Sequence, residues 1–544
     1  MEVVAVVLVM LLAIVISGAI TRMLPIGIPM PLVQIALGAA IAAVANLGVR
    51  LDPEIFFLLF IPPLLFLDGW HIPKEGFFRD SAIILELAFG LVFFTVVGLG
   101  FFLHWMIPTL PLAVAFALAA VLSPTDPVAV SAITSRVPIP IRVMHILEGE
   151  SLLNDASGLV CMRFALAAVL TGTFSLPAAV ANFLWLALGG IVFGAGSTWL
   201  ITQGRIWMSK RFGEDTGAQI LISLLIPFGA YLIAENLHCS GILAAVAAGI
   251  TMSYAEITGA TRGEIRMQRT AVWNTVQFAA NGAIFVLLGE QIPAIVADAS
   301  EAINEAGHGE VWLLAVYVIV ITAALVCLRF LWVWTSLRLT LYRAARRGEQ
   351  RPTPSWRLVV AVSLAGVRGA ITLAGVLTFP LALPNGSPFP ARELAIFLAA
   401  GVIMLSLIAA SIGLPKLLTN LQLPPEPNHQ EEEDRLRAAA AQAAIQAVES
   451  ALRRMAEGRS DADLYAEAAV EVMRMYRSRL DEQKSIEVAN QHRIVNEIER
   501  QLRLAGLQAE RDEVFKRARR RRIDDEIARK VIRELDLLEA RLTR

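Results

Sequence analysis

Asp155 is the residue whose surroundings point most directly to chemistry. It lies in a long apolar stretch, four positions after Ser151 and directly after Asn154. An ionised carboxylate in hydrocarbon costs at least about 2.5 kcal/mol, and a chain that keeps one there usually uses it to bind or relay an ion. A spacing of four places Ser151 and Asp155 on one helix face, with the amide of Asn154 on the adjacent face. This pattern indicates oxygen ligands for a hard monovalent cation.

The same carboxylate could also carry protons. A low dielectric favours the neutral form of a carboxyl group, so protons and metal cations compete for the same oxygens near physiological pH. Such competition predicts an exchange cycle at Asp155.

Further ionisable residues interrupt the apolar segments: Asp68, Asp126, Glu148, Glu150, Glu290, Arg329 and Arg368. Asp126 could cap the half-helix that follows a break in the chain, or it could act as a ligand or counter-charge. Asp68 lies either at the cytoplasmic interface of the membrane or in the ion site. The residue types leave both questions open.

Glu150 points to another side of the helix from Ser151, so we expect it to form an ion pair rather than to bind the ion. Arg329 and Arg368 are both candidate partners, and spacing does not choose between them. Glu148 and Glu290 lie near the ends of predicted spans, which favours a place at the membrane interface.

The composition predicts that membrane helices position these residues. Of 544 residues, 56% are hydrophobic and 17% are charged, and the first 420 contain repeated apolar runs that can cross about 30 Å of hydrocarbon. We therefore predict an all-α polytopic membrane protein with about thirteen transmembrane helices. The predicted spans lie near residues 3–20, 28–47, 53–70, 81–103, 111–134, 146–171, 177–201, 216–236, 239–254, 271–296, 311–337, 357–379 and 391–413.

Basic side chains alternate between the two sides of this membrane. Loops after odd-numbered spans hold most of the Lys and Arg, including Arg136, Arg205 and Arg343, while loops after even-numbered spans hold almost none beyond Arg50. Because Lys and Arg accumulate in cytoplasmic loops, we predict an N-terminus outside and a C-terminal tail in the cytoplasm. The first twenty residues lack a basic leader and a convincing cleavage site, so we expect a retained helix rather than a signal peptide.

Two spans carry residues that break a helix. The fifth contains Ser123-Pro-Thr-Asp-Pro127, and the twelfth contains Gly366-Val-Arg-Gly369. Broken helices free backbone carbonyls, which are tolerated where they line a cavity and which could complete a cation site together with Thr125. The two spans are seven apart and so run in opposite directions. This placement predicts an inverted repeat of spans one to six and eight to thirteen, with the site where the broken helices cross.

The composition changes after Pro424, and about half of all charged residues lie beyond Leu421. We therefore predict a transmembrane domain at 1–420 and a cytoplasmic helical tail at 421–544, for regulation or interaction. The basic run from Lys516 to Arg522 has acidic neighbours, which favours a solvated helix over binding of lipid or nucleic acid. The cysteines have no paired spacing, and no cofactor is expected.

Three motifs in order resemble the monovalent cation/proton antiporters of the sodium/proton exchanger branch. They are Ser123-Pro-Thr-Asp-Pro-Val-Ala129, Glu148-Gly-Glu-Ser-Leu-Leu-Asn-Asp155 and Gly366-Val-Arg-Gly-Ala-Ile371, and the resemblance covers about the first 415 residues. It implies a homodimer in the plasma membrane, surrounded by lipid, in which a six-helix core moves like an elevator against a dimerisation domain. Its substrates would be protons and sodium, with lithium or potassium as further candidates. Neither an enzyme activity nor a nucleic-acid partner is implied.

The resemblance also implies residue roles. Asp155 would bind sodium and accept the proton, with Ser151 and Thr125 as coordinating oxygens and Asn154 as a polar neighbour. The implied ion-binding set is Asp155, Asn154, Ser151, Thr125, Asp126 and Asp68.

The remaining implied roles concern charge. Asp126 and Arg368 would neutralise charge where the broken helices cross, and Glu150 would pair with Arg329. The electrogenic branch of the family has Asp where this chain has Asn154. The Asn-Asp form implies electroneutral exchange, and a single titrating carboxylate agrees with one proton per cation.

Two other functions compete with this interpretation. A sodium-coupled symporter of an organic solute could use similar crossed helices; it would not move protons with sodium alone. An intramembrane aspartyl protease could pair Asp126 with Asp155, but the Gly-x-Gly-Asp context of such enzymes is absent.

Overall fold

The structure is a computed structural model that describes residues 2–23, 28–45, 53–126, 130, 141–171, 176–213, 215–257, 263–306, 310–346, 355–419, 429–457, 462–481, 486–519, 531–532 and 534–539. The chain forms two compact units, Met1–Gln422 and Leu423–Arg544. The first unit is called the membrane unit below, and the second the tail unit.

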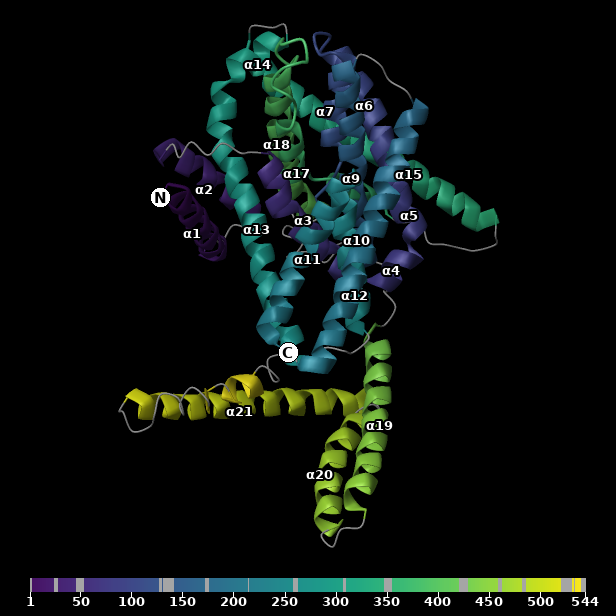
Figure 1. Cartoon of the computed structure of the whole chain (residues 1–544), viewed down its shortest axis with the longest axis vertical. Coiled ribbons are helices and arrows are strands. Elements are labelled where there is room, and N and C mark those ends of the chain that lie inside the picture. The colour runs from purple at the N-terminus through teal and green to yellow at the C-terminus, as the bar shows by residue number, and fades with distance from the viewer. Residues whose placement is uncertain are drawn as a thin grey trace. The chain divides into compact units, whose positions relative to one another are not determined.

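The described part of the membrane unit is built from helices (Figure 1). The first half contains α1 (Glu2–Met23), α2 (Met30–Ala45), α3 (Pro53–His71), α4 (Lys74–Arg79), α5 (Ser81–Leu85), the π-helical turn η1 (Glu86–Leu91), α6 (Val92–Met106), α7 (Leu112–Leu122) and α9 (Ile141–Thr171). The second half contains α10 (Leu176–Phe212), α11 (Thr216–Asn236), α12 (Gly241–Ile257), α13 (Gly263–Ala297), α14 (Ala299–Glu305), α15 (Trp312–Arg346), α16 (Trp356–Leu364), α17 (Ala370–Leu377) and α18 (Arg392–Leu418).

These helices confirm the predicted class, an all-α polytopic membrane protein. Among the described residues, eight helical segments are long and apolar enough to cross a membrane. They are Val4–Met23, Ser81–Met106, Arg142–Leu170, Ala181–Phe212, Thr216–Asn236, Ile265–Ala297, Trp312–Tyr342 and Arg392–Leu418. Four shorter apolar helical segments accompany them: Met30–Val44, Leu58–His71, Leu112–Leu122 and Gly241–Glu256. The count of thirteen spans stays a prediction.

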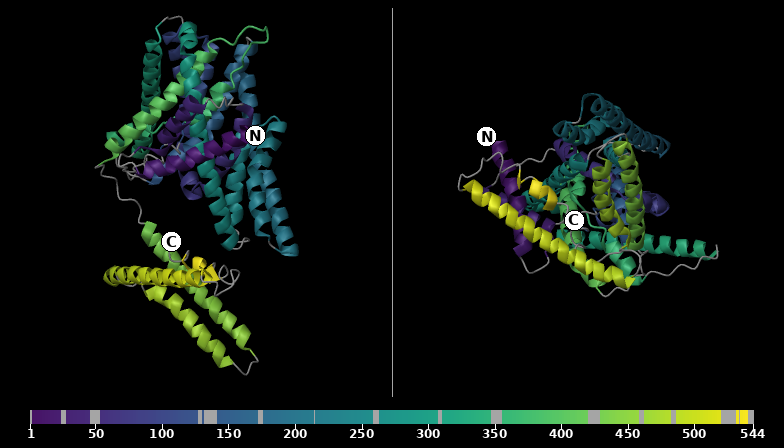
Figure 2. Two further views of the ribbon diagram at one scale, coloured as in Figure 1. Left: turned by 90° about the vertical axis from the view of Figure 1, so that its left-hand side faces the viewer. Right: turned by 90° about the horizontal axis from the view of Figure 1, so that it is seen from below.

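The membrane unit consists of two helical bundles packed against each other. The first bundle contains α1, α2, α3 and α10 to α13, and the second contains α4 to α7, α9 and α14 to α18. Most contacts between the bundles come from α3, α12 and α13, which face α9, α17 and α18 (Figures 1 and 2). Residues on α3 and α13 therefore face residues on the broken helices.

Reciprocal glycine contacts join two helix pairs of the first bundle. A Cβ atom at Gly249 of α12 would collide with the carbonyl oxygen of Phe66 on α3, and one at Gly69 of α3 would collide with that of Val246 on α12. The pair α2 and α13 repeats this pattern. An offset of seven spans relates α2 to α12 and α3 to α13, so the two pairs correspond under the predicted inverted repeat. Because glycine has no side chain, the backbones of the two helices can approach closely.

Gly38 and Gly289 make the equivalent contacts between α2 and α13. Their Cβ atoms would collide with the carbonyl oxygens of Val286 and Ile35, respectively.

The first bundle is also fixed by polar contacts. Glu256 of α12 accepts a hydrogen bond from Trp70 Nε1 of α3 at 2.7 Å and pairs with the fully buried Arg269 of α13. The Trp70 ring also contacts the ring of Phe66, from which it is tilted by 49°, and the guanidinium of Arg269 lies over it. One carboxylate thus joins α3, α12 and α13, the three helices that face the second bundle.

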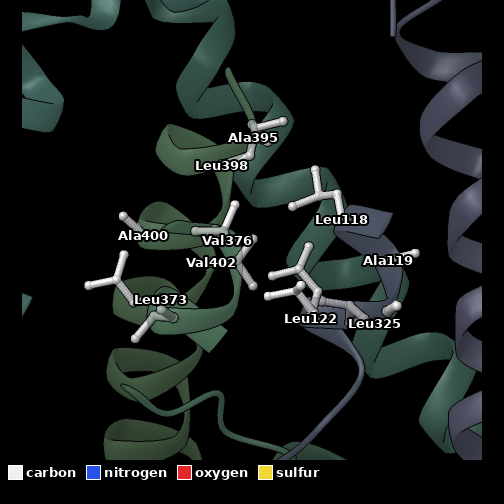
Figure 3. Close-up of a cluster of buried hydrophobic side chains, with 14 of the residues drawn as sticks. Leu118, Ala119, Leu122, Leu325, Leu373, Val376, Ala395, Leu398, Ala400 and Val402 are labelled. Atoms are coloured by element: carbon white, nitrogen blue, oxygen red, sulfur yellow. The ribbon is translucent and has the colours of Figure 1, made fainter. Parts of the chain in front are cut away.

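The core of the second bundle is apolar and closely packed. Side chains from α7, α15, α17 and α18 meet there, as Figure 3 shows for Leu122, Leu325, Val376 and Leu398. Each of these four is at most 1% exposed. Such packing holds the broken helices in fixed positions.

Both predicted helix breaks occur. Helix α7 ends at Leu122, two residues before Pro124, which has no backbone N–H to continue the helical hydrogen bonds. Helix α16 ends at Leu364, and residues 366–369 have no regular secondary structure before α17 begins. The second half of the fifth predicted span, with Pro127 and most of residues 128–134, lies outside the described residues, as do the loop residues Arg50 and Arg136.

The tail unit contains α19 (His429–Ala456), α20 (Ala462–Asp481) and α21 (Ile486–Arg519). Helices α19 and α20 lie side by side as a hairpin (Figure 2). A short helical stretch at 534–539 returns to α21, where Arg511 pairs with Asp536 at 2.8 Å and also with Glu539. Lys516 and Arg517 of the basic run are exposed and pair with Glu513 on the same helix.

Candidate functional site

The two interrupted segments meet directly. The backbone N–H of Asp126, after α7, donates to the carbonyl of Val367, between α16 and α17, at 2.8 Å. The carboxylate of Asp126 packs against the Cα of Gly369, where any Cβ atom would collide with it. Gly369 precedes the first turn of α17, so a negative charge lies at the positive end of that half-helix.

Arg368 makes the complementary contact from the other broken segment. Its Nε donates to the carbonyl of Leu122, the last residue of α7, at 2.9 Å, and its Nη1 donates to the carbonyl of Gly366. Helix α18 also contacts the segment between α16 and α17, because Ser406 Oγ accepts a hydrogen bond from the backbone N–H of Arg368 at 3.3 Å. The buried guanidinium thus satisfies a carbonyl at the end of α7, where a cation is favoured, and a second carbonyl two residues beyond the end of α16.

A cavity of about 60 Å³ lies beside this crossing. That volume exceeds the roughly 10–15 Å³ that one water molecule needs, so the cavity can hold a cation with part of its hydration shell. Both bundles contribute to the lining. Its polar lining residues are Asp68, Thr125, Asp126, Ser151, Asp155, Gln277, Asn281 and Thr372.

Hydrogen bonds orient two hydroxyl oxygens at this cavity. Ser151 Oγ donates to the backbone carbonyl of Thr125 at 2.8 Å, and Thr125 Oγ1 donates to Glu150 at 3.3 Å. Each hydroxyl proton is therefore engaged by another acceptor, which leaves oxygen lone pairs that are able to bind a cation beside Asp155. Asp155 is 6% exposed, and the charges of Asp126 and Asp68 both act on it.

Asn154 has a different position from its neighbours. Its Nδ2 donates to Thr125 Oγ1 at 3.0 Å, and it is not among the residues that line the cavity. Its Oδ1 is buried without a hydrogen-bond partner in the described part of the chain. The Asn154 amide thus positions the Thr125 side chain without itself lining the cavity.

Glu150 pairs with Arg329 rather than with Arg368. Arg329 Nη2 lies 2.7 Å from Glu150 Oε2, Nη1 contacts Oε1, and both side chains are at most 3% exposed. Arg329 also donates from Nε to the carbonyl of Val362 in α16 at 3.1 Å. The ion pair therefore joins α9, α15 and α16 behind the cavity.

The other predicted residues divide between the cavity and its surroundings. Asp68 of α3 lines the cavity from the first bundle. Glu148 is partly exposed, and Glu290 accepts a hydrogen bond from Gln291. Neither of them lines the cavity.

Sequence reasoning missed three polar lining residues: Gln277 and Asn281 of α13 and Thr372 of α17. A signal for the first two was available. They are four positions apart in an apolar span and so share one helix face. They carry no formal charge, so a place in an apolar span does not mark them as it marks Asp155.

Comparison with known proteins identifies the family of the chain. Residues 7–420 match the family model of the sodium/hydrogen exchanger, transmembrane. The chain is 41% identical over 547 residues to the Na(+)/H(+) exchanger YjcE of Escherichia coli (strain K12), which covers 100% of this chain and 99% of that protein. It is 44% identical over 421 residues to a sodium, potassium, lithium and rubidium/H(+) antiporter of Bacillus pumilus (strain SAFR-032). That match covers 77% of this chain and 61% of the relative's length.

A solved structure has the same fold. The sodium proton antiporter MjNhaP1 from Methanocaldococcus jannaschii aligns with a TM-score of 0.55 at 19% identity, over 77% of this chain and 100% of that structure. The region that the family model matches, residues 7–420, ends near Gln422, the last residue of the membrane unit. This chain is therefore a multi-pass membrane protein that belongs to the sodium/hydrogen exchanger family of antiporters.

Proposed function

We propose that the protein exchanges sodium for protons one for one, and that Asp155 carries both in turn. The observation that supports this most strongly is the cavity in which the Asp155 carboxylate meets the hydroxyl oxygens of Ser151 and Thr125. These are hard oxygen ligands of the kind that hard cations prefer. Binding sodium displaces the proton from Asp155, and binding a proton displaces sodium.

The charges around Asp155 favour this exchange. Asp126 is placed at the N-terminus of α17, and Arg368 at the C-terminus of α7, so each is stabilised by a helix end. Glu150 is neutralised by Arg329. The second bundle contributes two carboxylates to the cavity, Asp126 and Asp155. The contacts given for Asp155 include neither a helix end nor an ion-pair partner, so we assign proton uptake and release to Asp155.

The Asp155→Asn variant tests the assignment. We expect it to fold and to lose sodium-driven proton movement in proteoliposomes, because the amide neither releases a proton nor supplies a negative charge. Asp298→Asn is the matched control, since Asp298 is an exposed carboxylate at the start of α14. Undiminished exchange in the Asp155 variant would sink the proposal.

The stoichiometry has its own test. One-for-one exchange moves no net charge, so an imposed membrane potential leaves the steady rate unchanged. In this proposal Asn154 contributes an amide donor to Thr125 instead of a second charge. A rate that rises or falls strongly with the imposed potential would contradict the electroneutral assignment.

We further propose that lithium and potassium are alternative substrates. The relative from Bacillus pumilus is described as a sodium, potassium, lithium and rubidium/H(+) antiporter, and it is 44% identical over the aligned region. Proton flux in proteoliposomes challenged with each cation in turn decides this. A response to sodium alone would restrict the proposal to that ion.

The proposed transport cycle is elevator-like movement of the second bundle against the first. The cavity lies between the bundles: Asp155 and Thr125 belong to one side, and Asp68 and Asn281 to the other. Movement of the second bundle would carry the ion past the first. A crosslink between cysteines placed on α3 and α17 is expected to stop exchange, and its release by reductant to restore it.

We propose a homodimer in the cell membrane, in contact with lipid, with the N-terminus outside and the tail in the cytoplasm. The basic loops support this orientation. Labelling of single cysteines with an impermeant reagent in intact cells tests the topology, and crosslinking of the purified protein tests the dimer. Labelling of tail cysteines from outside would reverse the orientation.

The two competing functions receive no support from the family match. The cavity of about 60 Å³ is also small beside the roughly 300–1,000 Å³ of typical pockets for organic ligands. This size favours a small ion over an organic solute. Proton movement driven by sodium without any organic solute separates the two transport modes.

A further inference from the structure

The wall of the cavity opposite Asp155 carries two side-chain amides. Gln277 and Asn281 lie one helical turn apart on α13 and both line the cavity, whereas Asn274, one turn earlier, is exposed and does not. Neither lining amide donates to or accepts from another side chain or backbone group in the described part of the chain. Both side chains are partly exposed, so their polar atoms are available to whatever fills the cavity.

An amide group suits this position for two reasons. Its carbonyl oxygen is a hard ligand that binds a metal cation or a water of its hydration shell. It carries no formal charge, so it adds affinity for the cation without adding a second group that must release a proton. Gln277 and Asn281 can therefore affect which cation binds while Asp155 alone sets the proton count.

We propose that Gln277 and Asn281 determine cation selectivity by completing the shell of the ion held at Asp155. This inference rests on the proposed role of Asp155. The two walls belong to different bundles. A small ion such as lithium binds closely to the Asp155 wall, while a larger ion extends further across the cavity and gains more from the facing oxygens.

The oxygens of Gln277 and Asn281 reach an ion at Asp155 only when the two bundles are arranged so that α13 faces Asp155 across the cavity. Gln277 and Asn281 remain with α13 when the second bundle moves, so their oxygens serve the ion during binding and release rather than throughout the cycle. Their removal should then raise the apparent KM more than it lowers the maximal rate.

Near-isosteric substitutions test the inference. Gln277→Met and Asn281→Leu, alone and combined, keep side-chain size but remove the oxygens, and Asn274→Leu is the matched control on the same helix. In proteoliposomes we expect the double variant to raise the apparent KM for sodium about tenfold and that for lithium less than about threefold. The control should leave both values unchanged.

The outcomes separate the possible failures. An equal change for sodium and lithium, or an unchanged sodium-to-lithium ratio in both single variants, overturns the selectivity role and indicates a structural one. Exchange that survives in Asp155→Asn overturns the proposed function instead. Thermal melting of each purified variant shows whether it folds, and the single variants keep the test valid if the double variant does not.

Discussion

At the scale of single residues, the site depends on which groups are already paired. Ser151 and Thr125 direct their hydroxyl protons to other acceptors, so their oxygens remain for a cation beside Asp155. Glu150, five positions earlier, is neutralised by Arg329 and stays behind the cavity. Glu150 and Ser151 are adjacent in the sequence but make different contacts, because successive residues of a helix point in different directions.

The Glu150–Arg329 pair leads to a prediction about stability. Glu150→Gln leaves a buried guanidinium without its counter-charge, which typically costs about 3–5 kcal/mol. We expect a clear fall in the melting temperature of the purified protein. A double variant with Met at both positions should lose less than the single variant, because replacing both charges removes the unpaired one. A double variant that is less stable than Glu150→Gln would contradict the argument.

At the scale of elements, two helix breaks and a set of close helix contacts define the cavity. The breaks place Asp126 and Arg368 at opposite helix ends. The glycine contacts fix α3 and α13 in the first bundle, and these helices carry Asp68 and Asn281 to the other wall. A shift of either helix would change the width of the cavity.

The contact of α12 with α3 can be tested at one glycine. In Gly249→Ala the new methyl group meets the backbone of Phe66, so the helices must separate at a cost of roughly 1–3 kcal/mol. We expect a lower melting temperature and weaker cation affinity. Gly196→Ala in α10 is the control, because a Cβ there meets nothing within 4 Å. Equal behaviour of the two variants would refute the role of close packing.

The start of α9 gives a prediction about pH. The buried carboxylate of Asp80 accepts two hydrogen bonds from Arg142, at 2.6 and 3.1 Å. Burial raises the pKa of Asp80, but the hydrogen bonds and charges of Arg142 and Arg79 outweigh this and hold the pKa below its ordinary value of 3.8. A lowered pKa adds stability above the unfolded value, which is lost only as the pH falls through the folded one.

Asp80→Asn should therefore lower the melting temperature by the same amount at about pH 6 and at about pH 8, since both lie above that window. Melting curves of the purified variant and the unchanged protein check this. If the fall in melting temperature caused by Asp80→Asn is smaller at about pH 6 than at about pH 8, the Asp80–Arg142 ion pair titrates in the physiological range, contrary to this prediction.

At the scale of the whole molecule, the membrane unit contains every residue that lines the cavity. The tail unit has its own hairpin, α19 and α20, and its own ion pairs at Arg511. The two units are separately compact, and we propose that the tail unit has a regulatory role.

Removal of the tail tests this division. A chain truncated after Gln422 is expected to retain sodium-driven proton movement with an apparent KM for sodium within about threefold of the full chain, because the cavity residues are all kept. The pH dependence or the maximal rate can change if the tail regulates. A folded truncated protein without exchange would place the tail in the transport mechanism.

The sequence alone determined the class, the two breaks and the central carboxylate. Long apolar runs have few alternatives to membrane helices, Pro124 and Gly366 interrupt helices through local backbone geometry, and Asp155 in an apolar span is costly enough to stand out. Each of these conclusions depends on composition or on residues close together in the chain.

The tertiary structure decided what lies across space from those residues. Spacing left Glu150 with two arginines, and in the fold the Arg329 side chain reaches from α15 to Glu150 and to the carbonyl of Val362. Gln277 and Asn281 are more than a hundred residues from Asp155 and carry no charge, so only the contact between the bundles brings them to the cavity. Local patterns cannot specify such meetings, because they depend on how whole helices pack.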